Sequence, residues 1–483
     1  MDPFLLTHQV NDFLLDIGCR LSPVSIRDQM MRGYLAATRA LNENKIGPDK
    51  PLLVVGAGAA GATAAIVAAD NDVNTVLIDM APAAFNKQLY CHTRFVCPTT
   101  YDWPAEHWHE GRFPWLDEQA LPLPYNAGEA ARIAALWDAA LKVAEEERRP
   151  LLKLRFNTEM SEPSRFSKVT AADLEASGGL VDVIFKSTVA GVPPIPSQKF
   201  ALIISCIGQG RDRRSVGRYS GYSFWEDDPF SQEGWGLIGG TEPKIYISGG
   251  GDGALQDFLR ILTNVDSISA LFLRLPEPLR LDAAASIRST EDHSQRAYIW
   301  STPALDCAVF APLHKLYVKT VDDLLTKYPD AIECFMRETL RAPLGKIKIT
   351  LACSCTHFGS CYPLNRFLVL LYARYIERHY EKIGRDEKVI RYGVRTVKIE
   401  AKEHDECGPL PKNCHDKLHE IYFIDADCET SVEHENDEGL QRQMKEGPYN
   451  IVIIRHGIEW PPPLFVERPS SNARHLLPYY LNW

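Results

Sequence analysis

Short apolar runs along the chain alternate with longer stretches in which apolar residues recur every three or four positions. The short runs are typical of buried strands and the longer stretches of helices, so the alternation predicts an α/β fold. Strands are predicted at residues 51–55, 74–78, 151–156, 181–186, 199–206, 244–248, 268–274, 346–352, 389–400, 418–425 and 449–454. Helices are predicted from the end of the first glycine turn to about residue 70, and at 127–149, 255–262 and 363–382, with a mostly helical region at 281–345.

Residues 1–49 precede the first predicted strand and are expected to be a helical leader. Leu5, Val10 and Ile17 belong to an apolar set with helical spacing. Ser22-Pro23 is typical of a helix N-cap followed by proline in the first turn, which predicts a second helix to about residue 44. We therefore expect two helices packed on the main body.

The clearest motif follows the strand at 51–55 and is glycine-rich. It reads Gly56-Ala57-Gly58-Ala59-Ala60-Gly61, it opens an alanine-rich helix, and the next strand ends at Asp79. Backbone N–H groups at a helix N-terminus hold a dinucleotide pyrophosphate, because the helix dipole favours negative charge there. The glycines allow the tight turn, the approach of the phosphates and the close packing of helix on strand, and the acid accepts hydrogen bonds from ribose hydroxyls.

This segment predicts a dinucleotide site, whose residues are Gly56, Gly58, Ala59, Ala60, Gly61 and Asp79. Because Asp79 would repel a 2′-phosphate, the site suits FAD or NAD rather than NADP. The alternative is a glycine turn that only packs a strand–helix–strand unit.

A second strand, glycine turn and helix begin at residue 244. Gly249, Gly251 and Ala254 follow the pattern G-x-G-x-x-A, with Asp252 inside the turn, and predict a second nucleotide site. A rival interpretation is that the segment 241–252 closes the first site, with Asp252 reaching the flavin ribityl chain.

The predicted strand at 268–274 bears on which nicotinamide nucleotide would bind. Arg274 lies near its end, where a cation could receive the 2′-phosphate of NADPH. NADH is the other candidate, because Arg274 could equally be an ordinary surface arginine.

The order of these parts resembles that of flavoproteins with two dinucleotide-binding domains, such as thioredoxin reductases and flavin-containing monooxygenases. The corresponding parts are the turn at 56–61, Asp79, the strands at 151–198, ISCIGQG at 204–210, which contains Gly208, and GGGDGALQDFL at 249–259. The resemblance covers residues 50–265. It implies a Rossmann-like FAD-binding domain, a second NAD(P)-binding-like domain and a small antiparallel β insertion, with FAD and either NADPH or NADH as cofactors.

Two departures from that pattern bear on the reaction. Cys206-Ile207-Gly208 replaces the usual alanine-threonine-glycine. No glycine-aspartate flavin motif follows the second domain, since only 26 residues remain after Gly457. The second departure moves the likeness from disulfide reductases towards monooxygenase-like flavoproteins.

Residues 90–115 are rich in aromatic and basic side chains without helical or strand spacing, which predicts a long ordered loop. In the resemblance this loop lies near the flavin ring, where Arg94 or His92 could hold an anionic substrate or the flavin N1 charge. The alternative is that the aromatics anchor a surface loop. Arg455 and His456 end a predicted strand, where ligands bind in doubly wound sheets, so His456 is a third candidate catalytic residue.

Twelve cysteines are scattered through the chain. Cys91 and Cys97 lie where disulfide reductases carry a redox pair, but five residues separate them instead of four. Buried thiols are the alternative. The clusters at 353–361 and 407–415 lack the ligand spacing of a structural zinc site, so no metal is expected.

Composition excludes several classes of protein. With 45% hydrophobic and 24% charged residues the chain is globular, and its net charge of −10 disfavours nucleic-acid binding. The N-terminus carries Asp2, Asp12 and Asp16 and is no signal peptide, and no apolar run is long enough to cross a membrane. We expect a cytoplasmic protein whose partner is a small-molecule substrate, with homo-oligomerisation left open.

Together these features predict an FAD-dependent oxidoreductase that is monooxygenase-like and linked to NAD(P)H. The alternatives are a nucleotide sensor or scaffold with a degenerate second site, and a disulfide reductase using Cys91 and Cys97. The expected division is a helical leader at 1–49, an FAD-binding domain at 50–240, a second nucleotide-binding-like domain with insertions at 241–460, and a tail at 461–483.

Overall fold

The fold was analysed in a computed structural model of the chain. The structure describes residues 2–18, 25–101, 103–104, 121–124, 127–161, 169, 171–193, 195–208, 210–228, 243–265, 267–300, 306–346, 348–359, 361–402, 418–426 and 443–459. These residues form a mixed α/β fold with two separate, mainly parallel sheets. The α/β class predicted from the sequence is therefore confirmed.

The chain divides into two compact units. The first is drawn from Met1–His92, Arg112–Arg211 and Glu459–Trp483, and the second from Thr93–Gly111 and Asp212–Ile458, each as far as its residues are described. Two short strands, β12 (Arg211–Asp212) and β22 (Ile458–Glu459), lie at the limits of the units. Each unit is described by itself below.

The first unit is built on a six-stranded sheet in the order β1-β2-β11-β3-β4-β7. Its strands are β1 (Gln9–Asn11), β2 (Leu14–Asp16), β11 (Leu202–Ser205), β3 (Leu52–Val55), β4 (Thr75–Ile78) and β7 (Leu152–Arg155). All neighbours are parallel except β1 and β2. Strands β3, β4 and β11 are wholly buried, as continuous apolar runs in a parallel sheet should be.

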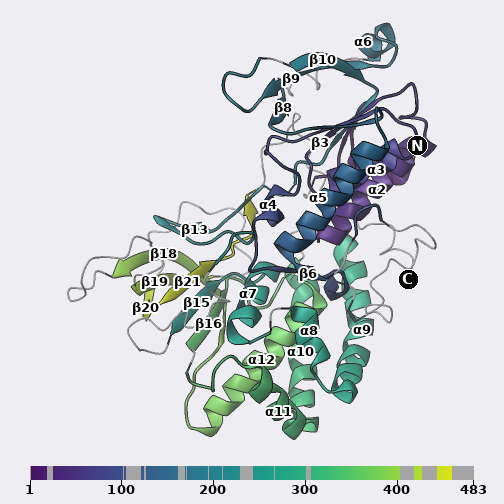
Figure 1. Cartoon of the computed structure of the whole chain (residues 1–483). Coiled ribbons are helices and arrows are strands. Elements are labelled where there is room, and N and C mark those ends of the chain that lie inside the picture. The colour runs from purple at the N-terminus through teal and green to yellow at the C-terminus, as the bar shows by residue number, and fades with distance from the viewer. Residues whose placement is uncertain are drawn as a thin grey trace. The chain divides into compact units, whose positions relative to one another are not determined.

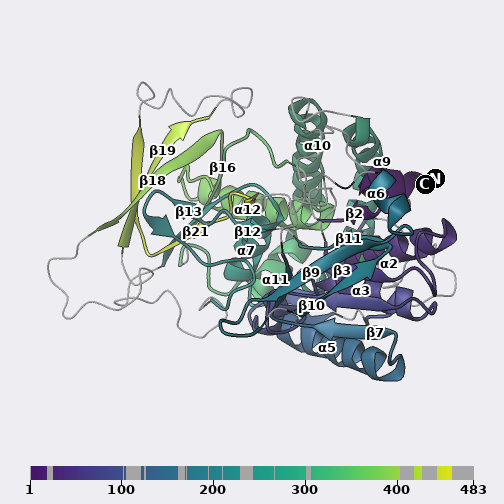
Figure 2. The same ribbon diagram turned by 90° about the horizontal axis from the view of Figure 1, so that it is seen from above.

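Helices cover this sheet, and α2, α3 and α5 lie side by side in both views (Figures 1 and 2). The helices of the unit are α1 (Pro3–His8), α2 (Ile26–Asn42), α3 (Ala59–Ala69), α4 (Asn86–Leu89), α5 (Ala130–Glu147) and α6 (Ala171–Ala176), and β6 (Gly128–Glu129) precedes α5. Nearly every residue of α3 is buried, because alanine lets neighbouring backbones approach closely. A Cβ on Gly33 of α2 would overlap the carbonyl of Ala60, so these two helices are in backbone contact.

The prediction of two helices before residue 49 is wrong for the first of them. Only Pro3–His8 is helical there, and Leu14–Asp16 is the strand β2, which pairs in parallel with β11. Spacing failed because residues 5–17 are apolar at positions that also fit two short strands on a buried sheet. The second predicted helix is α2, which begins at Ile26 after the N-cap Ser25, whereas Ser22 and Pro23 lie outside the described residues.

A small antiparallel sheet completes the first unit, in the order β10-β9-β8. Its strands are β8 (Thr158–Met160), β9 (Val181–Ser187) and β10 (Ile195–Phe200). Exposed and buried residues alternate along β9, so one of its faces packs on the core. This is the antiparallel insertion that the sequence predicted.

The second unit has a four-stranded parallel sheet in the order β17-β16-β15-β21. Its strands are β15 (Lys244–Ser248), β16 (Lys348–Cys353), β17 (Ile390–Tyr392) and β21 (Ile451–Ile454). Ile245, Ile247, Ile349 and Leu351 belong to one large core, which also includes residues of α7 (Asp252–Leu262) and α12 (Pro363–Lys382). The predicted helix at 363–382 is confirmed at both ends.

An antiparallel sheet lies on the other face of these strands. It has the order β18-β19-β20, with β18 (Val394–Lys402), β19 (Leu418–Asp425) and β20 (Met444–Tyr449). Tyr246 packs there with Ile421 and Phe423 in a second core. The short elements β5 (Phe95–Val96), η1 (Pro98–Tyr101), β13 (Ser215–Val216) and β14 (Tyr219–Ser220) also belong to this unit.

Four helices occupy the interval between α7 and β16. They are α8 (Ile268–Leu273), α9 (Glu277–Trp300), α10 (Asp306–Lys327) and α11 (Pro329–Thr339). The mostly helical region predicted at 281–345 is confirmed, but the strand predicted at 268–274 is a helix. The next strand along the chain after α7 is β16, which pairs with β15.

Candidate functional site

The first glycine turn joins β3 to α3 and has no room for side chains at two of its positions. Gly56 has φ +105°, and a Cβ there would lie 2.5 Å from the carbonyl oxygen of Cys206 at the end of β11. A Cβ on Gly61 would overlap the carbonyl oxygen of Gly56. Glycine is therefore required at both positions by the fold itself, whatever the turn binds.

Gly58 differs from the other two glycines, because no contacting atom of the described residues lies within 4 Å of the position a Cβ would take. It is the N-cap of α3, with extended φ and ψ angles that any residue adopts, and no side chain caps this helix end. The N–H groups of the first turn thus face an open position where an anion can bind. Unlike Gly56 and Gly61, Gly58 is therefore not required by packing among the described residues.

Asp79 lies at the end of β4 and anchors the turn. Its carboxylate accepts hydrogen bonds from Ala57 N at 2.6 Å and from Ala81 N at 2.7 Å. Burial raises the pKa of Asp79, and the two backbone hydrogen bonds oppose that rise. Each carboxylate oxygen keeps a second lone pair, so Asp79 can still accept from ribose hydroxyls.

Cys206 and Gly208 follow β11 and line the other side of this turn. The Cys206 side chain is buried, and its Cβ would contact a Cβ placed on Gly61. Gly208 has φ +79°, with open space where its side chain would be. Cys206, which stands where the resembled pattern has alanine, packs under the glycine turn.

Arg32 is a residue that sequence reasoning missed. It lies on α2 beside Gly33, which contacts Ala60 in the first turn of α3. The Arg32 side chain is 1% exposed, and neither terminal guanidinium nitrogen has a hydrogen-bond partner among the residues that the structure describes. Since β2 and β3 are parallel, α2 begins at the edge of the sheet where β3 ends, and helical side chains lean towards that beginning.

A buried cation without a partner is costly, so Arg32 favours an anionic ligand at this edge of the sheet. An arginine among the buried apolar residues Met30, Met31 and Leu35 was the signal in the sequence. The sequence analysis does not single out Arg32, because it predicts that residues 1–49 are a leader outside the nucleotide domain.

The second glycine turn joins β15 to α7 and repeats the geometry of the first. Gly249 has φ +145°, and a Cβ there would overlap the carbonyl oxygen of Arg455 at the end of β21. Gly251 is the N-cap of α7, with extended backbone, no side-chain cap and open space at its Cβ position. Ala254 is fully buried against the sheet. This segment thus belongs to the sheet of the second unit, as the second-nucleotide interpretation predicted.

Asp252 distinguishes the second turn from the first, because it puts a carboxylate in the first turn of α7. Its Oδ1 accepts hydrogen bonds from Tyr362 N at 2.8 Å and from Asn365 Nδ2 at 2.7 Å. Burial raises the pKa of Asp252 to about 6, against the opposing effect of Asn365. At neutral pH this carboxylate is mostly ionised and competes with a phosphate for the end of the helix.

The end of β16 is where a second nucleotide would present its ribose. Cys353 lies there, and its thiol donates to the carbonyl of Gly249 at 3.5 Å. Burial raises the pKa of Cys353 well above its usual value. Arg274, proposed from the sequence for this role, is instead the C-cap of α8, so it does not end a neighbouring strand.

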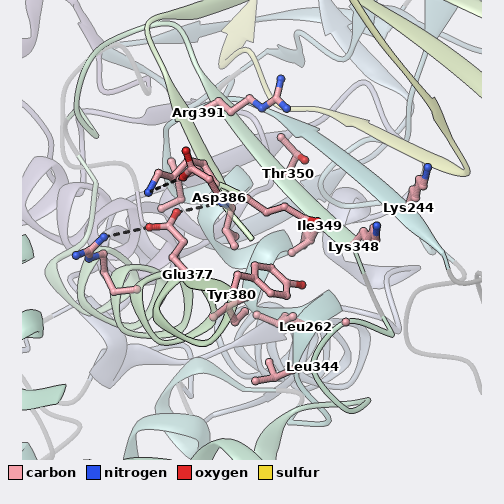
Figure 3. A pocket seen from close by; sticks show the side chains of 18 of the residues that line it. Lys244, Leu262, Leu344, Lys348, Ile349, Thr350, Glu377, Tyr380, Asp386 and Arg391 are labelled. Carbon is pink, nitrogen blue, oxygen red and sulfur yellow. Dashed lines mark hydrogen bonds and ion pairs between the residues drawn. The ribbon is translucent and has the colours of Figure 1, made fainter. Parts of the chain in front are cut away.

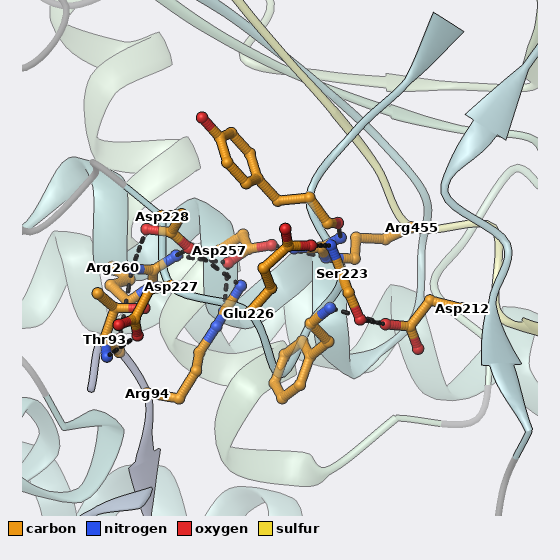
Figure 4. Close-up of polar contacts among 12 residues, drawn as sticks. Thr93, Arg94, Asp212, Ser223, Glu226, Asp227, Asp228, Asp257, Arg260 and Arg455 are labelled. Atoms are coloured by element: carbon orange, nitrogen blue, oxygen red, sulfur yellow. Dashed lines mark hydrogen bonds and ion pairs between the residues drawn. The ribbon is translucent and has the colours of Figure 1, made fainter. Parts of the chain in front are cut away.

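Arg94 belongs to a buried cluster of charges in the second unit (Figure 4). Its guanidinium pairs with Asp257, which also accepts from Arg455 Nε at 2.8 Å and from Arg260 Nη2 at 3.2 Å. Arg260 in turn donates to both oxygens of Asp228, at 2.9 and 2.6 Å. Burial raises the pKa of Asp257, but the three guanidinium groups outweigh it and hold that pKa well below its usual range.

The three arginines and two aspartates of this cluster sum to a formal charge of +1. The Arg94 guanidinium also lies 4.2 Å from the centre of the Phe224 ring, which offsets part of that charge. Arg94 is thus buried in an ion-pair network in the core of the second unit. Its role as a catalytic residue stays a prediction. Asp257 and Arg260, expected to be surface or packing residues, are members of this network.

The two candidate histidines have different surroundings. The His92 side chain is exposed and bonds through Nδ1 to Glu129 Oε1 at 2.6 Å. His456 Nε2 lies 2.8 Å from Ser248 Oγ, at the end of the strand that carries the second turn. Burial lowers the pKa of His456, so this imidazole is neutral at pH 7.

The aromatic stretch is described only in part, since residues 105–120 lie outside the described residues. Trp103 is 1% exposed and packs against Phe272 and Phe367, both at 5.4 Å between ring centres. Tyr101 lies against Tyr362 at 4.4 Å. Trp103 and Tyr101 thus hold the described part of this segment against the second unit's core.

Cys91 and Cys97 are reduced and buried, and Cys97 Sγ lies 3.0 Å from Ser269 Oγ. Among the described residues no group of three His, Cys, Asp or Glu side chains could hold a metal ion. Cys407, Cys414 and His415 lie outside that part of the chain. No helix with described residues is long and apolar enough to cross a membrane.

No family model and no curated protein matches the chain. A thioredoxin reductase from T. acidophilum matches with TM-score 0.31 and 11% identity over 85% of this chain and 78% of its own. A bacillithiol disulfide reductase from Bacillus cereus matches with TM-score 0.38 and 8% identity over 85% and 78%. The FAD-bound cadaverine monooxygenase DfoA from Erwinia amylovora matches with TM-score 0.31 and 10% identity over 86% and 79%. Because these scores lie below 0.5, the case for a nucleotide site depends on the geometry described above.

Proposed function

We propose that this protein is an FAD-dependent oxidoreductase that takes its electrons from NADPH or NADH. The observation that carries the proposal is the open, uncapped N-terminus of α3 at Gly58, with Asp79 at the end of the next strand. The open helix end supports a phosphate site there, and Arg32 adds a buried guanidinium whose terminal nitrogens have no partner in the described part of the chain. Bound flavin would supply hydride acceptance and onward electron transfer, to oxygen or an organic acceptor.

The protein's own contribution is binding and orientation. The backbone amides of the first turn of α3 would donate to the pyrophosphate, and Arg32 would neutralise part of its charge. Asp79 would accept from the ribose hydroxyls while its hydrogen bond to Ala57 N holds the turn in place. In the second unit, the N-terminus of α7 at Gly251 would take the nicotinamide nucleotide.

A substitution at Gly58 tests the first site without disturbing the fold. Gly58→Asp is sterically allowed, and aspartate is a favourable N-cap, so the variant should fold at least as well as the parent. Its carboxylate would occupy the phosphate position with the wrong charge. We expect the parent to purify with a flavin absorbance that mass spectrometry identifies as FAD, and Gly58→Asp to be folded and colourless. A parent without flavin, or a variant that binds FAD as the parent does, would refute the proposal.

Gly251→Asp is the matched substitution in the second turn and serves as the control for the first. It should leave bound FAD unchanged and weaken reduction of the flavin by NADPH and NADH, measured anaerobically. Parallel titrations with the two nucleotides decide between them. If the flavin of the parent is not reduced by either, the second site is not used for electron entry.

The second candidate function is a flavoprotein that senses or carries nucleotide without turnover. Asp252 favours it, because a carboxylate in the first turn of α7 repels a pyrophosphate. Bound FAD that neither nicotinamide nucleotide reduces would support this alternative.

A disulfide reductase would need an accessible thiolate, whereas Cys91 and Cys97 are both buried. Turnover with NADPH should therefore survive Cys91→Ser together with Cys97→Ser. Loss of turnover in a variant that still binds FAD would reinstate the cysteines as a redox pair.

A further inference from the structure

The second unit contains a large cavity at the end of its sheet opposite the glycine turn (Figure 3). Its volume is about 950 Å³, which is within the range of small-molecule sites. Lys244 and Lys348 begin strands β15 and β16 and line it, whereas the turn at Gly249 follows the last residue of β15. Five strand residues correspond to about 16 Å, so a ligand here would not contact a nucleotide at the turn.

The cavity exists because β16 is covered on one side over only part of its length. Strand β15 pairs with β16 from Lys348 onward, but β17 pairs with β16 only from Leu351. Beside the first half of β16 the wall is therefore made of side chains, which are mainly apolar. They include Leu262, Leu344, Ile349, Leu370, Ile376 and Tyr380.

Charges at the cavity are distributed unevenly. Glu377 and Asp386 lie on one side in Figure 3 and the two lysines on the other. The carboxylate of Glu377 is already engaged, by Arg374 at 3.1 Å and by Val389 N at 3.0 Å. The cationic side is different, because no carboxylate of the described residues lies within 4.0 Å of Lys244 Nζ or Lys348 Nζ.

Lys244 and Lys348 are also direct neighbours across the parallel strands. Like charges in such a pair repel each other and weaken the sheet unless an anion lies between them. Tyr392, which lines the cavity too, has a buried hydroxyl with no hydrogen-bond partner in the described structure. The lysine end of the cavity thus offers two cations and an apolar wall, whereas Tyr392 pairs with Cys353 at the other end of β16.

We infer that this cavity binds an amphipathic small molecule with an anionic head, a carboxylate or a phosphate. The head lies between Lys244 and Lys348, and the apolar body lies along Leu262, Leu344 and Tyr380. Lys244 and Lys348 lie at the opposite end of the sheet from the second glycine turn, so the ligand is an effector and not the nucleotide of that turn. The inference does not depend on the proposed function.

Binding of three ten-carbon probes, measured by calorimetry below their micelle concentrations, tests it. Decanoate and decyl phosphate carry the two candidate heads, and decanol is the neutral comparison. We expect the full chain to bind both anions at one site per chain and at least tenfold more tightly than decanol. The tighter of the two anions identifies the head group.

Lys244→Gln with Lys348→Gln should weaken both anions at least tenfold and leave decanol unchanged. Lys398→Gln with Lys445→Gln is the matched control, since it removes the same charge from exposed positions outside the cavity. Leu344→Trp narrows the cavity and should weaken all three probes. Thermal unfolding verifies that each variant is folded.

Three results would overturn the inference. These are no saturable binding to the parent chain, equal affinity for decanol and the anions, or a loss of anion affinity in the control pair as large as in the cavity pair. Unchanged binding in folded Leu344→Trp would also overturn it, because the probes would then bind elsewhere.

Discussion

Asp252→Asn should stabilise the protein at neutral pH. Both hydrogen bonds to Asp252 end on Oδ1, and the amide oxygen of asparagine can accept both, so the substitution removes charge and keeps the contacts. Burial raises the pKa of Asp252 from 3.8 to about 6. A pKa shift of roughly two units corresponds to a free energy of about 3 kcal/mol. This value is an upper bound because the side chain is partly exposed. We therefore expect the free energy of unfolding to rise by about 1–2 kcal/mol.

The pH dependence of that gain follows from the direction of the shift. The folded state binds the proton more tightly than the unfolded state, so the parent gains stability as the pH falls from about 7 to 4. The advantage of Asp252→Asn should be complete at pH 7.5, about half as large at pH 5, and about a fifth as large at pH 4. Urea unfolding of both proteins at the three pH values measures it. An equal advantage at every pH, or a less stable variant at pH 7.5, would refute the conclusion that burial of the charged Asp252 carboxylate destabilises the fold.

Three further predictions concern steric, ionic and ligand contacts. Gly61→Ala should lower solubility or the midpoint of thermal unfolding sharply, since its Cβ meets the Gly56 carbonyl, whereas a normal midpoint would show that the helix can shift. Asp257→Asn should destabilise the second unit by about 3–5 kcal/mol in urea unfolding, because it removes the charge that pairs with buried guanidinium groups. Lys319→Ala, which breaks an exposed ion pair, is the control and should cost under about 0.5 kcal/mol. Arg32→Gln should weaken FAD binding at least tenfold without lowering the stability of the flavin-free protein, and unchanged FAD affinity would contradict an anion contact.

Much of the fold could be predicted from apolar runs and turn glycines. The strands and helices that carry both glycine turns lie where the pattern put them, because a buried parallel strand must be continuously apolar. The errors have one physical cause, which is that short apolar segments fit helix and strand equally well. Leu14–Asp16 and Ile268–Leu273 were both assigned to the wrong class for this reason.

The candidate site was predictable only where a backbone constraint shows in the residue type. Gly56 and Gly249 could be identified from the sequence, because few residues other than glycine adopt their φ angles. Arg32, Asp252 and the lysine pair at the cavity depend on which segments become neighbours, and spacing along the chain does not contain that information. Register decided the last case, since Lys244 and Lys348 lie over a hundred residues apart in the sequence and side by side in the sheet.

The position of β11 in the first sheet has a consequence for synthesis of the chain. This strand lies between β2 and β3, although it is made long after both. At roughly 5–20 residues per second, about 7–30 s pass between the appearance of β3 and that of β11 on the ribosome. During that interval the edges of β2 and β3 that later pair with β11 are exposed. Exposed apolar edges of this kind are the most prone to pair with other chains. Slow or interrupted translation between residues 56 and 205 should therefore cost this protein more soluble product than the same delay placed after residue 205.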